Sequence, residues 1–90
     1  MNKGELVEKV AARADLSRAS AQSVLDAVLG TIADALKDGK PVTLTGFGTF
    51  DVNARPARDA RNPRTGETVR VPATMVVKFR PGKALKDAVQ

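Results

Sequence analysis

The segment 55–67, near the middle of the chain, contains no apolar residue larger than Ala or Pro. Arginine recurs in this segment at every third position, at Arg55, Arg58, Arg61 and Arg64. A segment of this composition buries too little apolar surface to offset the entropy that is lost when it becomes ordered. It therefore cannot form part of a hydrophobic core. Because strand-like patterns flank it on both sides, we expect a long hairpin arm that is exposed to solvent.

The flanking patterns alternate apolar and polar residues with the period of a β-strand. Before the segment the apolar positions are Phe50, Val52 and Ala54, and after it they are Val69, Val71, Ala73, Met75, Val77 and Phe79. Pairing the two runs places the tip of the hairpin between Asn62 and Gly66 and defines the arm as residues 53–75. Pro56 and Pro72 each remove a hydrogen-bond donor, which is tolerated in an exposed two-stranded ribbon.

Two amphipathic helices are predicted before the hairpin. Asn2 and Glu5 fit a capping box that starts the first helix, which we expect to end near Ala14. Ser17 caps the second helix, and Gly39 ends it. The second helix has an apolar face that is wider than one short helix can cover. This width indicates packing against a sheet, against a second copy of the chain, or against both.

Shorter elements complete the predicted fold. Residues 42–44 form a short strand, followed by a tight turn in which Gly46 and Gly48 are free to adopt positive φ. Pro81 breaks the return strand, and residues 83–89 form a short final helix. The expected fold class is α+β. It combines a two-helix hairpin, a three-stranded antiparallel sheet with a long protruding β-ribbon arm, and a short C-terminal helix.

The chain is expected to be one small domain whose core needs support. It has 90 residues, part of which form the arm, so it buries little apolar surface and is marginal as a monomer. The absence of Cys and His excludes disulfides and the commonest zinc ligands, and we expect no metal or cofactor. Oligomerisation is the remaining support. Gly30, in the second helix, slightly favours close approach of another backbone over a tolerated surface glycine.

The net charge of +5 comes from the second half of the chain. Residues 1–45 carry six basic and six acidic side chains, whereas residues 46–90 carry nine basic and four acidic ones. This division favours a scaffold joined to a polyanion-binding surface, although charge alone fits a merely soluble basic domain equally well. No apolar run has the length of a signal-peptide core or a membrane span. We therefore expect no membrane association and a cytoplasmic location.

Binding is better supported than catalysis. The chain lacks His, Cys, Tyr and Trp, and its acidic residues are scattered, so we expect no enzyme. The planar guanidinium of arginine matches phosphate and stays charged, so the arm predicts an electrostatic track for a phosphate backbone; a solvated charged loop is the alternative. Asn62 and Pro63 fit the first two positions of a type I turn. A proline at an arm tip is also a rigid apolar wedge that can enter between base pairs.

Motifs spread over the whole chain resemble those of the bacterial histone-like HU proteins. They are Gly46-Phe47-Gly48-Thr49-Phe50, Arg55, Arg58, Arg61-Asn62-Pro63, Thr65-Gly66-Glu67, Phe79-Arg80 and Gly82-Lys83-Ala84-Leu85-Lys86. The resemblance implies an intertwined homodimer with a helical base, in which residues 1–52 and 76–90 form the dimerisation body. It also implies that two arms curl around the minor groove, where Pro63 intercalates and kinks the duplex.

The same resemblance implies a set of functional residues. On the arm the expected DNA-binding residues are Arg55, Arg58, Arg61, Asn62, Pro63, Arg64 and Thr65, and along the flank of the body they are Lys3, Arg80, Lys83 and Lys86. The expected dimer core consists of Phe47, Phe50, Phe79, Leu29, Ile32 and Leu36. The sequence departs from the usual pattern at three arm positions. Ala60 replaces a glycine, Asn53 stands where relatives often have a basic residue, and Asp59 adds a negative charge.

The leading hypothesis is a non-sequence-specific architectural protein of the nucleoid that binds, bends and compacts double-stranded DNA. Bending a duplex costs of order 1–6 kcal/mol, so pre-bent, nicked or gapped DNA should bind better than straight DNA. A subunit of integration host factor, with preferred sites, is the nearest alternative. A basic RNA-binding protein and a structural homodimer whose arms bind protein belong to other classes. A homodimer is expected, and a heterodimer with a paralogue is the alternative.

Overall fold

The computed structural model describes residues 1–90, and the chain divides into two compact units, Met1–Asp34 and Ala35–Gln90. The boundary falls within helix α2, near its C-terminal end. The predicted division into a body and an arm runs along different lines and stays a prediction. No helix combines the length and the apolarity that are needed to cross a bilayer.

The first unit holds helix α1, Lys3–Ala14, and most of helix α2, Arg18–Lys37. The Asn2 side chain accepts a hydrogen bond of 2.9 Å from the Glu5 N–H, which confirms the predicted N-cap. Asp15 ends α1 in the left-handed conformation with φ of 54°. The Ser17 hydroxyl accepts a bond of 3.1 Å from the Ser20 N–H, so the predicted cap of α2 is also confirmed.

The core of the single chain is very small. Its buried residues are Val7, Ala11 and Ala21, with Val10 and Leu25 packed against them. No large side chain is fully buried anywhere in the chain. Gly30 has open space around it, since no atom would lie within 4 Å of an added Cβ. Close approach of another backbone to Gly30 therefore stays a prediction that concerns a second chain.

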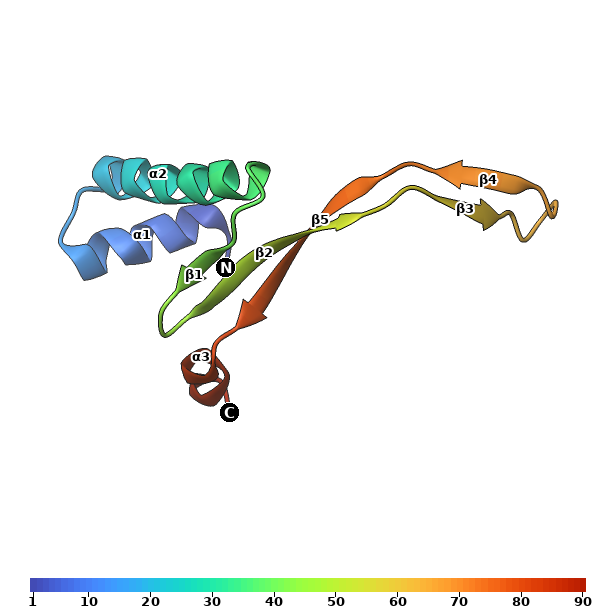
Figure 1. The fold of residues 1–90 in the computed structure, drawn as a ribbon. Coiled ribbons are helices and arrows are strands. Elements are labelled where there is room, and N and C mark those ends of the chain that lie inside the picture. The colour runs from blue at the N-terminus through green and yellow to red at the C-terminus, as the bar shows by residue number, and fades with distance from the viewer. The chain divides into compact units, whose positions relative to one another are not determined.

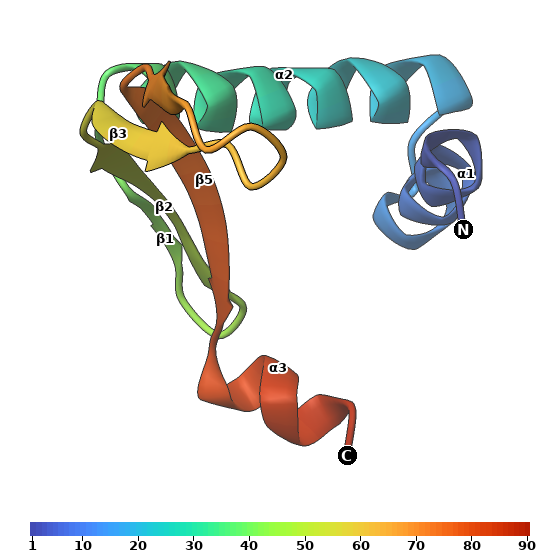
Figure 2. The same cartoon turned by 90° about the vertical axis from the view of Figure 1, so that its right-hand side faces the viewer.

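The second unit contains all the strands and the last helix (Figures 1 and 2). Its elements are β1, Val42–Leu44; β2, Gly48–Arg55; β3, Arg58–Arg61; β4, Thr68–Val71; β5, Thr74–Pro81; and α3, Lys83–Ala88. Strands β1, β2 and β5 form an antiparallel three-stranded sheet in the order β1-β2-β5, and β3 and β4 form a separate antiparallel pair. The predicted α+β class and the three-stranded sheet are confirmed.

The turn between β1 and β2 uses its two glycines differently from the prediction. Gly46 has φ of 82°, as expected of a tight turn, and the Phe47 N–H donates to the Leu44 carbonyl at 2.9 Å. Gly48 does not adopt positive φ and instead lies in β2. A Cβ at Gly48 would lie 2.6 Å from the Phe79 ring and 2.7 Å from the Arg80 carbonyl oxygen. Close packing, and not backbone freedom, is what requires glycine here.

The return strand, predicted as one strand from Val69 to Phe79, is in fact two strands. The first ladder ends at the pair Arg55 and Thr74, and the second begins at the pair Arg58 and Val71. Two residues of each strand, 56–57 and 72–73, lie between the two ladders. Each of these two segments contains one proline, which has no N–H to donate. Since both strands have the same number of unpaired residues, the register is the same in both ladders.

We expect Gly48→Ala to lower the free energy of unfolding by about 1–3 kcal/mol, because the added methyl group would overlap Phe79 and the Arg80 backbone. Urea denaturation followed by circular dichroism would measure the change. Gly4→Ala is the matched control, since its Cβ would meet only the Asn2 side chain, at an ordinary 3.5 Å. Equal stabilities for the two variants would contradict the packing role of Gly48.

Candidate nucleic-acid interface

The tip of the hairpin is a short loop in which Asn62 takes part in three hydrogen bonds. The Asn62 N–H donates to the Glu67 carbonyl at 2.7 Å, and the Gly66 N–H donates to the Asn62 carbonyl at 2.8 Å. The Asn62 side chain accepts a third bond, of 2.9 Å, from the Arg64 N–H. Pro63 is exposed within this loop. The position predicted for the tip is confirmed, and Pro63 lies on it.

The predicted type I turn at Asn62 and Pro63 stays a prediction. The bond from Gly66 to Asn62 spans four residues, so the loop is an α-turn and is one residue longer than a β-turn. Gly66 closes it with φ of 75°. Ala60, which replaces the usual glycine, pairs with Val69 in the ladder and does not have positive φ. The strand conformation at this position therefore accepts an alanine without strain.

Each of the two ladders has two chemically different faces, because alternate residues of a strand point to opposite sides. The apolar face is defined by Phe50, Val52, Ala54 and Ala60 on the outgoing strands and by Val69, Val71, Met75, Val77 and Phe79 on the returning ones. Arg58 is the only charged residue on this side of the two ladders. Met75 and Val77 are each 60% exposed, so the face around them is uncovered in the single chain.

The opposite side carries all the other charges of the two ladders. This polar face is defined by Thr49, Asp51, Asn53, Arg55, Asp59 and Arg61 and, on the returning strands, by Thr68, Arg70, Thr74, Lys78 and Arg80, with Val76 as its apolar member. The four arginines of the predicted track do not share one face, and their role as a track stays a prediction. Arg58 and Arg61 lie on opposite faces of the ladder of β3 and β4, Arg55 lies in the ladder of β2 and β5, and Arg64 lies in the tip loop. A spacing of three residues cannot keep to one side of a strand, whose period is two.

Acidic side chains on the polar face are paired with arginines. Arg70 Nη1 lies 3.2 Å from Asp59 Oδ1, directly across the outer ladder, β3 and β4. Arg80 Nη2 lies 3.7 Å from Asp51 Oδ2 in the inner ladder, β2 and β5. None of the four arginines of segment 55–67 takes part in an ion pair. These four cations are therefore free to meet an external anion.

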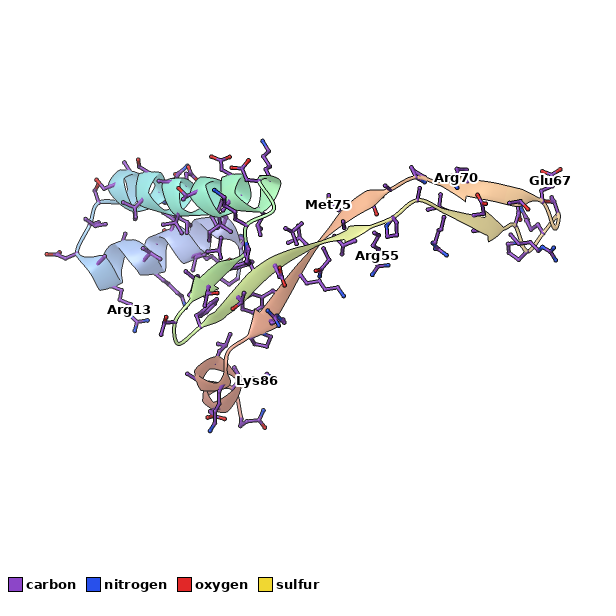
Figure 3. All side chains as sticks on the ribbon, viewed as in Figure 1. Arg13, Arg55, Glu67, Arg70, Met75 and Lys86 are labelled. Atoms are coloured by element: carbon purple, nitrogen blue, oxygen red, sulfur yellow. The ribbon has the colours of Figure 1, made fainter.

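Arg70 is a basic residue of the arm that the sequence prediction missed. It lies on the outer ladder, between the proline-containing break and the tip (Figure 3). The register places it on the same face of this ladder as Arg61. Strand alternation, combined with the pairing that centres the hairpin near residues 62–66, would have placed it there. The motifs from which the DNA-binding residues were predicted do not contain position 70.

The predicted lysines of the body lie in two different units. Lys83 and Lys86 are exposed on α3 and take part in no ion pair. Lys3 begins α1 in the first unit, where its Nζ lies 2.7 Å from Asp26 Oδ1. A common DNA-binding flank formed by these three lysines stays a prediction.

The three phenylalanines predicted for the dimer core do come together in the second unit. The ring centroids of Phe50 and Phe79 are 4.9 Å apart, and those of Phe47 and Phe79 are 5.6 Å apart. Phe47 is 47% exposed, and Leu29 in the first unit is equally exposed. Ile32 and Leu36 are half-buried. Each of these side chains is thus left partly open, and their burial in a dimer stays a prediction.

The chain resembles known proteins over its whole length. The model of the family described as bacterial DNA-binding protein matches residues 1–90. The chain belongs to this family, whose members include the HU proteins. It is 53% identical to HU-beta of Salmonella typhimurium over 99% of both chains. It is also 53% identical to HU 1 of Bacillus subtilis, over 99% of this chain and 97% of the relative.

Solved structures of HU proteins have the same fold as this chain. An HU–DNA cocrystal structure from Anabaena matches with a TM-score of 0.86 and 47% identity, covering 99% of this chain and 97% of the other. HU from Thermotoga maritima matches with a TM-score of 0.73 and 36% identity over the full length of both. The resemblance inferred from the motifs is confirmed. The family consists of structural DNA-binding proteins and not of enzymes.

We expect backbone amides of the outer ladder to exchange with solvent about tenfold faster, or more, than those of β2 and β5. An isolated pair of short strands is marginally stable, whereas β2 is paired on both sides by β1 and β5. Hydrogen exchange of the free protein, read by NMR for each residue, would test this. Equal protection of Ala60 and Phe50, which is paired with both β1 and β5, would contradict it.

Proposed function

We propose that this protein is a dimeric architectural protein that binds double-stranded DNA through paired β-arms and bends it, with little preference for sequence. The observation that carries the proposal is the exposed hairpin beyond β2 and β5. None of residues 55–67 is buried, and their four arginines lack acidic partners. Membership of a DNA-binding family supports the same conclusion, as does the match to an HU protein crystallised with DNA.

In this proposal the arm has two functions: its positive charges contact the DNA backbone, and the proline at its tip bends the duplex. Arg55, Arg58, Arg61 and Arg64 contact phosphates or the groove, together with the polar tip residues Asn62 and Thr65. Pro63 enters between base pairs from the minor groove and kinks the duplex. Phosphate contacts carry no sequence information, and no helix of the chain has the features of a base-reading element. Binding is therefore tolerant of sequence and favours DNA that is already bent, nicked or gapped.

The body contributes further phosphate contacts and the dimer interface. We assign Arg80, Lys83, Lys86 and Lys3 to contacts with the DNA backbone. The interface buries the phenylalanine cluster of the second unit together with Leu29, Ile32 and Leu36. A single chain buries only three core residues, which is less than a stable domain needs. Two identical chains would cover the exposed apolar positions; a heterodimer with a paralogue would do so in the same way.

Two alternatives are separated from this proposal by simple competition assays. The relatives described above are HU proteins, which does not favour a subunit of integration host factor. Comparing random duplexes with candidate sites at one salt concentration would distinguish the two. Competition between duplex DNA and structured RNA would test the RNA-binding alternative. A protein of this function acts in the cytoplasm, on the nucleoid.

We expect Pro63→Ala to reduce DNA bending strongly while leaving the salt dependence of binding nearly unchanged. The substitution removes the wedge but no charge, and the salt dependence reports the number of phosphate contacts. Fluorescence energy transfer between the two ends of a duplex would measure the bend. The exposed Pro41, which lies outside the arm, provides the control substitution. Equal bending by the Pro63 variant and the natural protein would refute the wedge.

We expect Arg58→Ala and Arg61→Ala each to weaken binding to all duplex sequences and to flatten its salt dependence. The slope of log K against log salt should fall in magnitude by about 0.9 for each phosphate that is no longer neutralised, and by up to about twice that in a dimer with two arms. Titrations at several salt concentrations would give the slopes. Arg13→Ala, at the end of α1, is the control for removal of a positive charge. A slope unchanged in both arm variants would contradict the phosphate contacts.

A further inference from the structure

The ion pair between Asp59 and Arg70 is the only one on the outer ladder. Arg70 Nη1 lies 3.2 Å from Asp59 Oδ1, and the two residues face each other in the register. Their side chains are 68% and 62% exposed, Arg70 being the more exposed of the two. Because solvent screens such a pair and no other group holds it, another anion can compete for the arginine.

The pair lies where the arm would meet phosphates. On the polar face of the outer ladder the charged residues are Asp59, Arg61 and Arg70. Asp59 therefore cancels one of only two positive charges on this side. Arg61 has no acidic partner and is already assigned to DNA, and Arg70 is on the same face and in the same short ladder.

We propose that Arg70 is a further DNA-contacting residue and that Asp59 masks it in the free protein. On binding, a phosphate of the duplex replaces the Asp59 carboxylate as the partner of Arg70. Arginine favours this exchange because its planar fork binds phosphate as well as carboxylate. The phosphates of DNA are also numerous and closely spaced along the groove. Asp59 thus lowers the affinity of the arm, and Arg70 determines by how much. This inference rests on the proposed function.

The test is a double-mutant cycle of Asp59→Asn and Arg70→Gln, measured by titration with one nicked duplex at several salt concentrations. Asp59→Asn should tighten binding about two- to fivefold for each arm, which is the strength of an exposed ion pair expressed as a ratio. Arg70→Gln should reduce the magnitude of the salt slope by about 0.9 for each arm. In the Arg70→Gln variant, Asp59→Asn should raise the affinity for the duplex by a smaller factor. That factor should equal the one obtained by removing any other negative charge from the arm.

Glu67→Gln supplies that reference value. Glu67 is an acidic residue near the tip of the same arm and takes part in no ion pair. A salt slope unchanged by Arg70→Gln would overturn the proposed contact. An equal gain from Asp59→Asn with and without Arg70 would overturn the masking. If the natural protein bound no duplex, or if Arg61→Ala changed neither affinity nor salt slope, the proposed function would fail. If duplex binding and the Arg61 effect were as expected and only the Arg70 and Asp59 variants differed from expectation, this inference alone would fail.

Discussion

The antiparallel register of the hairpin is the constraint on which the functional surface depends. A strand has a period of two, so a shift of one residue would exchange every side chain between the faces. Here the register runs unchanged from Gly48 and Pro81 at the base to Arg61 and Thr68 beside the tip. Within each ladder one side is consequently apolar, apart from Arg58 in the outer ladder, and the other side carries the remaining charges. The two faces are thus suited to different partners.

The two prolines between the ladders interrupt the hydrogen bonding without changing this register. In an antiparallel pair, neighbouring positions alternate between hydrogen-bonded and non-bonded. Continuing the register would place Pro56 opposite Ala73 and Ala57 opposite Pro72. These are adjacent pairs, so one of the two prolines must fall at a hydrogen-bonded position, whichever phase the ladder has. At least one bond is therefore missing, and no residue is inserted between the two ladders.

Much of the fold followed from local signals in the sequence. The helix ends were predicted because Asn2 and Ser17 cap their helices by contacts within one turn. The tip was predicted because both flanking strands alternate, which fixes their pairing. The missed features depend on contacts across strands: Gly48 is explained only by the Phe79 ring opposite it. Similarly, the partition of the arginines and the pairing of Arg70 with Asp59 become visible only when register and alternation are combined.

The break also explains why an arm of this kind suits a partner of variable sequence. The outer ladder is joined to the sheet by two unpaired residues on each strand. In the proposed function, such a junction lets the outer ladder follow grooves of different width and curvature. Ordering it on binding costs entropy, which limits affinity for any one site. In the proposed function, affinity comes from the charges of the arm and from Pro63 at its tip, and both act alike on every sequence that can be bent.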